Sequence, residues 1–546
     1  MISFSEGLVR VRARGGALAW VMLALTAATY AQAQGSAVSC DADGIGAAKL
    51  KADQGVPQII SVSAGMAGTV PYCLVKVLVP KSINIWVGLP MTGAWNGRWE
   101  SVGGGAYAGA ASIPTAALRD GYAAATTDTG HAAGGVDGRF GMVEPGKPNV
   151  ILQKDFASRS EHLMAVIGKQ LVQQFYGKKP AYSYWNGCST GGRQGLRMAQ
   201  DYPDDYDGIL AGAPAIHWDR FQAAMLWPQV VQQSANGGPI GGGAPAILSA
   251  KLKLATAKAI SACDALDGIT DGIIGDPRRC DYKISADPTV TLATCSSTDG
   301  ACLTPGEAAA IDGIWQGPVD CGDGKSDLCA VPDVASRTLT AKGAKRLWYG
   351  EVRGTDLTAL AGPQPFPIAT EQPRYWVYFD PSWDWHTVTS PNFPNFFRDT
   401  IEKVGPMMAS ENPDLSAFRR HGGKLVLYHG WSDQLIMPQG TIDYYDKVTQ
   451  KLGDGYEHTQ QFARLFMAPG VGHCAGGAGP QPQQTFDAVV NWVEKGAAPA
   501  TITASRVVNG STQTRPLCPY PAEARWKGTG STDDAANFEC VVVPKH

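Results

Sequence analysis

The sequence predicts a protein of the α/β class whose main domain is interrupted by an inserted domain. Short apolar runs alternate with helical patterns from residue 34 to about residue 217, and the alternation returns from about residue 399 onward. Residues 218–398 lose this rhythm and contain many glycines, prolines and cysteines. We therefore expect one α/β domain built from residues 34–217 and 399–546, with residues 218–398 inserted as a second, disulfide-linked domain.

The composition is that of a large globular chain. It has 546 residues, 44% of them hydrophobic, which excludes the disordered and fibrous classes. The 46 basic and 49 acidic side chains give a formal net charge of −3, so no excess of positive charge steers the chain onto nucleic acid. We expect no nucleic-acid partner.

The first residues have the pattern of an export signal. Arginines between Arg10 and Arg14 precede an apolar run at 17–28, and Ala31-Gln32-Ala33 forms a small-residue cleavage site. The alternative is a membrane anchor, which needs about 20 apolar residues and so a longer run than this one. We expect cleavage of residues 1–33 after Ala33, a secreted or periplasmic mature protein, and no membrane contact after cleavage.

Apolar spacing predicts the individual elements. Residues 83–87 alternate as a strand, and the leucine, isoleucine and phenylalanine positions at 163, 167, 171 and 175 follow a helical period. Residues 424–428 and 463–467 are buried-type strands, each followed by a glycine-containing turn. The inserted domain ends in nine aromatic residues between Tyr375 and Phe397, which suit a pocket wall, a domain interface or the core of that domain.

The segment Tyr182–Gly192 carries the clearest chemical motif. A strand leads into Gly187-Cys188-Ser189-Thr190-Gly191, and a helical pattern follows over 194–201. Glycines flank the serine because the turn is too tight for Cβ atoms, and the strained turn lifts the serine hydroxyl above the edge of the sheet. This nucleophile elbow makes Ser189 the candidate nucleophile and predicts an α/β-hydrolase fold.

A serine nucleophile needs an imidazole base and a carboxylate that orients the base. In this fold the acid and then the base follow the serine along the chain. Asp433 comes directly after the strand at 424–428, and His473 follows the strand at 463–467 and a glycine loop. His429 is the alternative base, but its place at the end of the acid's own strand favours a structural role.

Twelve cysteines follow the predicted cleavage site, and an even number in an exported chain indicates disulfides. Cys188 precedes the candidate nucleophile and Cys474 follows the candidate base, so a Ser189–His473 contact would bring these two cysteines near bonding distance. The remaining cysteines are assigned by nearness in sequence, although other pairings are open. These expected pairs are Cys40–Cys73, Cys263–Cys280, Cys295–Cys302, Cys321–Cys329 and Cys518–Cys540.

Acyl transfer at a serine also needs two backbone N–H donors for the oxyanion. Thr190, the residue after the nucleophile, is predicted to supply one of them. Gly103-Gly104-Gly105 follows an earlier predicted strand, and Gly104 is our candidate for the second, although a simple flexible turn explains the same glycines.

These residues resemble the tannase and feruloyl esterase family, whose secreted members carry a Cys-Ser, Asp and His-Cys arrangement with bridged cysteines. The matching positions are Cys188-Ser189, Asp433 and His473-Cys474, together with Asn186–Gly192 and Arg515–Pro521. The resemblance implies an α/β-hydrolase domain with an inserted lid, acting on esters of aromatic phenolic acids such as ferulate or gallate. The family also includes a hydrolase of mono(2-hydroxyethyl) terephthalate, which the elbow and lid resemble too.

A second candidate site lies in the predicted lid, where three aspartates between Cys263 and Ile273 are separated by glycines. Such carboxylates can fold around one hard cation such as Ca²⁺, although an ordinary Asp-Gly turn has the same residues. The family resemblance implies a structural calcium site formed by the side chains of Asp264, Asp267 and Asp271 and the carbonyls of Ile269 and Ile273. We expect no organic cofactor.

The sequence therefore predicts a secreted serine esterase whose substrate is a small aromatic ester. Trp348 and Arg353 are the expected lid contacts, since an arginine pairs well with the free carboxylate of a terephthalate monoester. A terephthalate monoester hydrolase is the first alternative function. A non-catalytic binding module of hydrolase-like fold is the second, and such modules usually lack a member of the triad.

Overall fold

The computed structural model describes residues 38–53, 55–107, 109–132, 134–235, 246–296, 298–322, 345–453 and 455–543. The predicted signal peptide, residues 1–33, lies outside this range. None of the helices in the described part of the chain combines the length and apolar character that crossing a bilayer requires.

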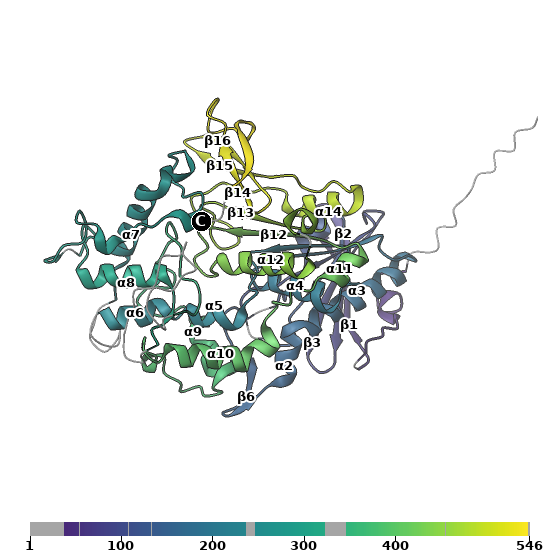
Figure 1. Ribbon diagram of the computed structural model, residues 1–546. Coiled ribbons are helices and arrows are strands. Elements are labelled where there is room, and N and C mark those ends of the chain that lie inside the picture. The colour runs from purple at the N-terminus through teal and green to yellow at the C-terminus, as the bar shows by residue number, and fades with distance from the viewer. Residues whose placement is uncertain are drawn as a thin grey trace, which may run out of the picture. The chain divides into compact units, whose positions relative to one another are not determined.

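A nine-stranded mixed sheet has the strand order β1-β2-β3-β5-β4-β8-β9-β12-β13. Figure 1 labels β1, β2, β3, β12 and β13 of this sheet. Strands β1, β2, β3 and β5 pair antiparallel, whereas neighbours from β5 to β13 pair parallel. Their bounds are Gln58–Ala67 (β1), Val70–Val79 (β2), Ile83–Pro90 (β3), Arg98–Val102 (β4), Ala123–Thr127 (β5), Tyr182–Cys188 (β8), Gly208–Gly212 (β9), Lys424–Gly430 (β12) and Ala463–Ala468 (β13). The predicted strands at 83–87, 424–428 and 463–467 are confirmed as β3, β12 and β13.

The central strands are apolar on both faces, as parallel strands covered by helices must be. Along β8 and β12, successive residues join different buried clusters: Trp185 and Leu427 face one side, Tyr184 and Val426 the other. The first face packs against α3 (Ser160–Tyr176), α4 (Thr190–Asp201) and α12 (Gln439–Leu452), and the second against α14 (Thr485–Lys495). The predicted helix at 163–175 is confirmed as part of α3. This arrangement is the α/β-hydrolase fold.

The remaining helices before and after the middle of the chain are short. They are α1 (Thr115–Arg119), α2 (Val150–Lys154), α11 (Ser416–His421) and α13 (Gly455–Thr459), and a small hairpin pairs β6 (Met142–Glu144) with β7 (Lys147–Pro148).

The middle of the chain is mainly helical. Its elements are α5 (Trp218–Ala224), α6 (Trp227–Ala235), α7 (Ser249–Cys263), α8 (Pro305–Gln316), β10 (Val319–Asp320), β11 (Lys345–Arg346), α9 (Pro367–Gln372) and α10 (Phe393–Met408). The aromatic rings of Trp376, Trp385 and Phe393 are buried in one large cluster with α5, α6 and α8. That cluster also includes Tyr107 and Ile436 from the segments before and after the middle of the chain. The residue boundaries of an inserted domain stay a prediction.

The last part of the chain forms antiparallel strands. They are β14 (Gln481–Pro482), β15 (Ile502–Val508), β16 (Ser511–Leu517), β17 (Ala522–Trp526) and β18 (Phe538–Val542). The β15–β16 turn has Asn509 and Gly510 at φ of 51° and 80°, the positive values for which a two-residue hairpin selects Asn-Gly. Figure 1 shows β14, β15 and β16 near β13, and Pro519 bridges to Phe466 of β13.

Candidate active site

Ser189 sits at a sharp turn between β8 and α4. Its backbone has φ of 64° and ψ of −125°, a strained conformation for a residue with a side chain. The flanking glycines allow the turn: a Cβ on Gly187 would lie 2.5 Å from the Gly191 carbonyl, and a Cβ on Gly103 would lie 2.6 Å from Gly191 Cα. The sequence Gly187–Gly191 therefore folds as the predicted elbow and leaves Ser189 half-buried at the sheet edge.

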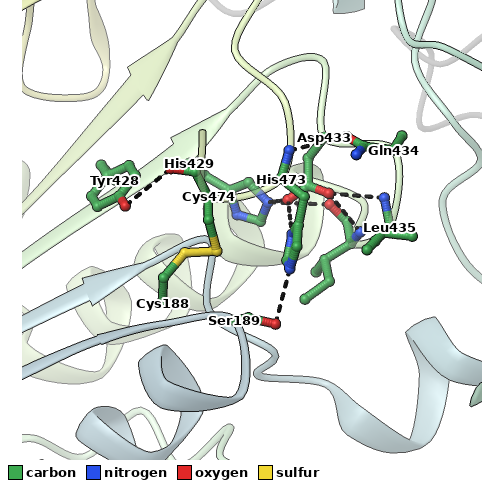
Figure 2. The surroundings of a disulfide bond; sticks show 10 residues. Cys188, Ser189, Tyr428, His429, Asp433, Gln434, Leu435, His473 and Cys474 are labelled. Atoms are coloured by element: carbon green, nitrogen blue, oxygen red, sulfur yellow. Dashed lines mark hydrogen bonds and ion pairs between the residues drawn. A yellow bond between two sulfur atoms is a disulfide. The ribbon is translucent and has the colours of Figure 1, made fainter. Parts of the chain in front are cut away.

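The three predicted triad residues converge at this edge (Figure 2). His473, on the loop after β13, places Nε2 2.9 Å from Ser189 Oγ, and its Nδ1 lies 2.8 Å from Asp433 Oδ2, on the loop after β12. Since the carboxylate can only accept, His473 donates from Nδ1 and accepts the Ser189 hydroxyl proton at Nε2. Residues 284 positions apart thus form one chain of hydrogen bonds.

Asp433 is buried and fully hydrogen-bonded. Its Oδ1 accepts the N–H groups of Leu435 and Ile436, both at 2.9 Å, and its Oδ2 accepts from His429 Nε2 at 3.0 Å besides His473. Burial opposes ionisation, but the charge of His473 and the two histidine hydrogen bonds outweigh it and lower the pKa of Asp433. The pKa of His473 is raised, because the charge and hydrogen bond of Asp433 exceed the effect of burial.

His429, the alternative base, contacts the acid and not the nucleophile. Its ring is fully buried, and Nδ1 lies 2.8 Å from Thr441 Oγ1. The sequence did not indicate this second histidine on Asp433. It also did not indicate Gln434, whose Oε1 accepts the backbone N–H of His473 at 3.0 Å and fixes the loop of the base.

A disulfide joins the neighbours of Ser189 and His473, as Figure 2 shows. The Cα atoms of Cys188 and Cys474 lie 5.9 Å apart, within the usual range for a bridge. Four of the sequence-local pairs are also present: Cys40–Cys73, Cys263–Cys280, Cys295–Cys302 and Cys518–Cys540. The Cys321–Cys329 pair lies partly outside the described residues.

The two predicted oxyanion donors differ in their surroundings. Thr190 begins α4, so its N–H has no helical carbonyl one turn earlier and is a natural donor for an anion. The Gly104 N–H, in contrast, donates to Gln194 Oε1 at 2.9 Å. This contact departs from the role predicted for Gly104, because the amide is engaged by a side chain of α4.

The two predicted substrate contacts lie in different environments. Arg353 donates from Nε to the Tyr282 carbonyl at 2.6 Å and stacks its guanidinium 5.2 Å from the Trp315 ring, so residues from the middle of the chain already bind this cation. Trp348 packs against His217, with ring centroids 4.9 Å apart. Its buried indole N–H has no hydrogen-bond partner among the described residues.

The aspartate loop predicted to bind calcium borders a cavity. Asp264 accepts three backbone N–H groups from residues 271–273, and Asp271 pairs with Arg515 at 2.8 Å. Burial and the nearby Asp271 and Asp264 charges raise the pKa of Asp267 to about 6. A cavity of about 80 Å³ is lined in part by Asp267, Ile269, Asp271 and Ile273.

This donor chemistry fits a hard cation, since carboxylates and carbonyls are the oxygen ligands that Ca²⁺ prefers. No group of three or more acidic, histidine or cysteine side chains in the described residues is already arranged as metal ligands. Arg515, which pairs with Asp271, lines the same cavity, so a cation there would compete with this ion pair.

Comparison with known proteins identifies the class of the chain. Residues 73–541 match the family described as "Tannase and feruloyl esterase". A protein of Arthroderma benhamiae named "Probable feruloyl esterase" is 36% identical over 468 residues, covering 84% of this chain and 82% of that protein. The "Mono(2-hydroxyethyl) terephthalate hydrolase" of Piscinibacter sakaiensis is 31% identical, covering 84% and 81%.

A solved structure supports the same fold. Feruloyl esterase B from Aspergillus oryzae matches with a TM-score of 0.74 and 28% identity, covering 90% of this chain and 98% of that one. The chain is therefore a carboxylic ester hydrolase of the α/β-hydrolase fold. Within that class it belongs to the tannase and feruloyl esterase family.

Proposed function

We propose that this protein is a secreted serine esterase that hydrolyses esters of aromatic phenolic acids. The observation that carries the proposal is the continuous hydrogen-bond chain from Ser189 through His473 to Asp433. The names of the relatives support an aromatic acyl group, because two of those described above are feruloyl esterases.

The reaction follows from this geometry. Ser189 Oγ attacks the ester carbonyl carbon while His473 Nε2 takes its proton, and Asp433 stabilises the imidazolium. The oxyanion is held by the Thr190 N–H and by a backbone N–H of the glycine loop that begins at Gly103. The tetrahedral intermediate expels the alcohol, which takes the proton from His473, and leaves an acyl-serine. Water, deprotonated by His473, then releases the aromatic acid and restores Ser189.

A matched panel of methyl ferulate, methyl gallate and mono(2-hydroxyethyl) terephthalate tests the substrate class. We expect higher kcat/KM on the phenolic esters, because the Arg353 cation is held by Tyr282 within the lid. A preference for the terephthalate monoester would reverse this assignment.

Ser189→Ala is the control for every substrate. We expect it to fold like the parent and to lose hydrolysis, since no other group of the triad can attack the ester. Equal turnover by this variant and the parent would end the serine esterase proposal, whereas a folded parent with no turnover on the panel would favour the hydrolase-like binding module.

Export is part of the proposal. The five bridges support it, since disulfides persist in oxidising compartments. Sequencing the amino terminus of the protein from its native host is expected to begin at Gln34. A mature protein that still starts at Met1 would contradict signal cleavage.

We also propose structural calcium in the lid loop, held by Asp264, Asp267 and Asp271 with two backbone carbonyls. Metal analysis after dialysis is expected to find one calcium per chain, and EGTA is expected to lower Tm by several degrees. Asp267→Asn should abolish this EGTA effect, whereas Asp281→Asn, at an exposed position of the same region, should keep it. A stable, metal-free protein with an unchanged Tm would exclude the site.

A further inference from the structure

Gln194 links the nucleophile helix to the glycine loop. It lies five residues after Ser189 in α4, and its side chain is 1% exposed. The Oε1 atom accepts the Gly104 N–H at 2.9 Å, and Nε2 donates to Glu161 Oε1 on α3. One amide side chain therefore connects α4, α3 and the loop that approaches the nucleophile.

Simple hydrogen-bond chemistry fixes the orientation of this amide. A backbone N–H can only donate, so Gly104 must face the oxygen of Gln194, and the Gln194 nitrogen must face Glu161. Glu161 is fully buried, and burial raises its pKa to about 7. Both the neutral and the ionised carboxyl keep an accepting oxygen, so the amide keeps its orientation in either state.

A second contact holds the other end of the same loop on α4. Thr190 Oγ1 donates to the Ala106 carbonyl at 2.6 Å. Gly103 lies so close to Gly191 that a Cβ there would meet its Cα at 2.6 Å. The loop of residues 103–106 is thus bound to the helix that carries Ser189 at Gly104 and at Ala106, with close packing at Gly103.

We propose that Gln194 is a positioning residue that holds the glycine loop at the distance from Ser189 at which the loop stabilises the oxyanion, with Glu161 as its buried anchor. The inference rests on the proposed esterase function. Because oxyanion donors act on charge that develops in the transition state, a displaced loop lowers kcat more than it changes KM. Gln194 touches neither substrate nor Ser189 in this role.

The test compares Gln194→Met with Gln200→Met. Gln200 is on the same helix, and its Nε2 also makes two hydrogen bonds, to the Ser410 carbonyl at 2.8 Å and to Tyr444 Oη at 2.9 Å, away from the glycine loop. Both variants lose two side-chain hydrogen bonds, so a general loss of stability affects both. Assays use p-nitrophenyl acetate, whose small acyl group avoids the question of acid specificity, with Ser189→Ala as the blank.

We expect Gln194→Met to lower kcat about 10- to 100-fold, below the ~10²–10³-fold loss that removing an oxyanion donor outright produces. KM should stay within about threefold, in keeping with an interaction made in the transition state. The inhibition constant of phenylboronic acid, which forms a tetrahedral adduct on the serine, should rise in parallel with the fall in kcat. Gln200→Met should change neither quantity, at a temperature where both variants are folded.

The results separate this inference from the proposed function. If Ser189→Ala is inactive but Gln194→Met matches Gln200→Met in kcat and boronate inhibition, the positioning role is wrong and the esterase proposal stands. If Ser189→Ala retains parental turnover, the esterase proposal itself fails.

Gln194→Glu keeps the inference testable if Gln194→Met does not fold. Its carboxylate still accepts the Gly104 N–H but faces Glu161, so the two carboxyls must share a proton. We expect kcat relative to the parent to be near normal at low pH and to fall as the pH rises and both carboxyls ionise. A ratio of variant to parent kcat that stays constant with pH would contradict the positioning role of Gln194.

Discussion

Asp433 shows how much of the active site depends on a single side chain. Two histidines and two backbone N–H groups converge on its carboxylate, and the side chain is fully buried. Hydrogen bonds to a charged group contribute about 1.5–3 kcal/mol each. Its position is therefore fixed before substrate binds, and the imidazole of His473 is held in the tautomer that can accept the serine proton.

Asp433→Asn tests this electrostatic role directly. Asp433 raises the pKa of His473, so the asparagine should lower that pKa and move the acid limb of kcat/KM to lower pH, because His473 must be neutral to act as a base. The kcat should fall by about 10⁴-fold.

The titration can be measured without turnover. NMR of His473 in Ser189→Ala and in Ser189→Ala/Asp433→Asn gives the pKa of His473 with and without the Asp433 carboxylate. A higher pKa in the asparagine protein would contradict the assigned partner.

For single residues, the sequence predicts which residues form the active site better than it predicts which side chains contact them. Ser189, Asp433 and His473 are recognisable because each follows a strand in the order that the fold requires. The contacts of Gln194 with Gly104 and of His429 with Asp433 cannot be predicted from the sequence, because they depend on where a buried side chain points. The glycine run after a predicted strand makes Gly104 a candidate donor, but the partner of its amide depends on the position of Gln194.

Among the elements, β4 carries an unusual feature for an inner strand. Glu100 lies in the middle of the sheet, 4% exposed, and accepts a hydrogen bond from Asn186 of β8 at 3.1 Å. Burial raises its pKa to about 7 from an ordinary 4.5. As the pH rises from about 4.5, the unfolded chain loses this proton first, so stability falls until the folded carboxyl also ionises near pH 7.

Glu100→Gln should remove this dependence while keeping the bond to Asn186. Raising the pKa from 4.5 to about 7 corresponds to about 3 kcal/mol, so the variant should be more stable than the parent by up to that amount at pH 8 and by little at pH 4.5. Urea unfolding at both pH values measures it. Glu539→Gln, an exposed glutamate of β18, is the control and should show no such difference. Equal gains at both pH values would exclude ionisation as the cause.

Elements were predictable where their apolar pattern was strong. Strands β3, β12 and β13 and helix α3 carry clear periods, and the structure has them close to the expected residues. The hairpin β15–β16 was not predicted, because many residues of its strands are half-exposed and show no clear apolar alternation. Its Asn509-Gly510 turn is a local signal that does not indicate a separate small sheet.

For the whole molecule, the bridges should differ in what they stabilise. Cys188–Cys474 closes a loop of 286 residues and Cys40–Cys73 one of 33. Loop-closure entropy assigns about 6 kcal/mol to the first and about 4 kcal/mol to the second, in a model-dependent scale. The first also holds the base beside the nucleophile.

We expect Cys188→Ala/Cys474→Ala to lower both Tm and kcat, and Cys40→Ala/Cys73→Ala to lower Tm with kcat nearly unchanged. Calorimetry and ester hydrolysis below both transitions measure the two effects. Full activity in the first double variant would show that the triad holds its geometry without the bridge.

The long bridge also has a consequence for biosynthesis. A ribosome adds about 5–20 residues per second, so with 284 residues between them Ser189 emerges roughly 15–60 s before His473. Throughout that interval Cys188 has no correct partner, while the cysteines of the middle segment appear one after another. The Ser189–His473 contact therefore forms only after the last segment arrives, and any earlier pairing of Cys188 with another cysteine must then be exchanged for the bond to Cys474.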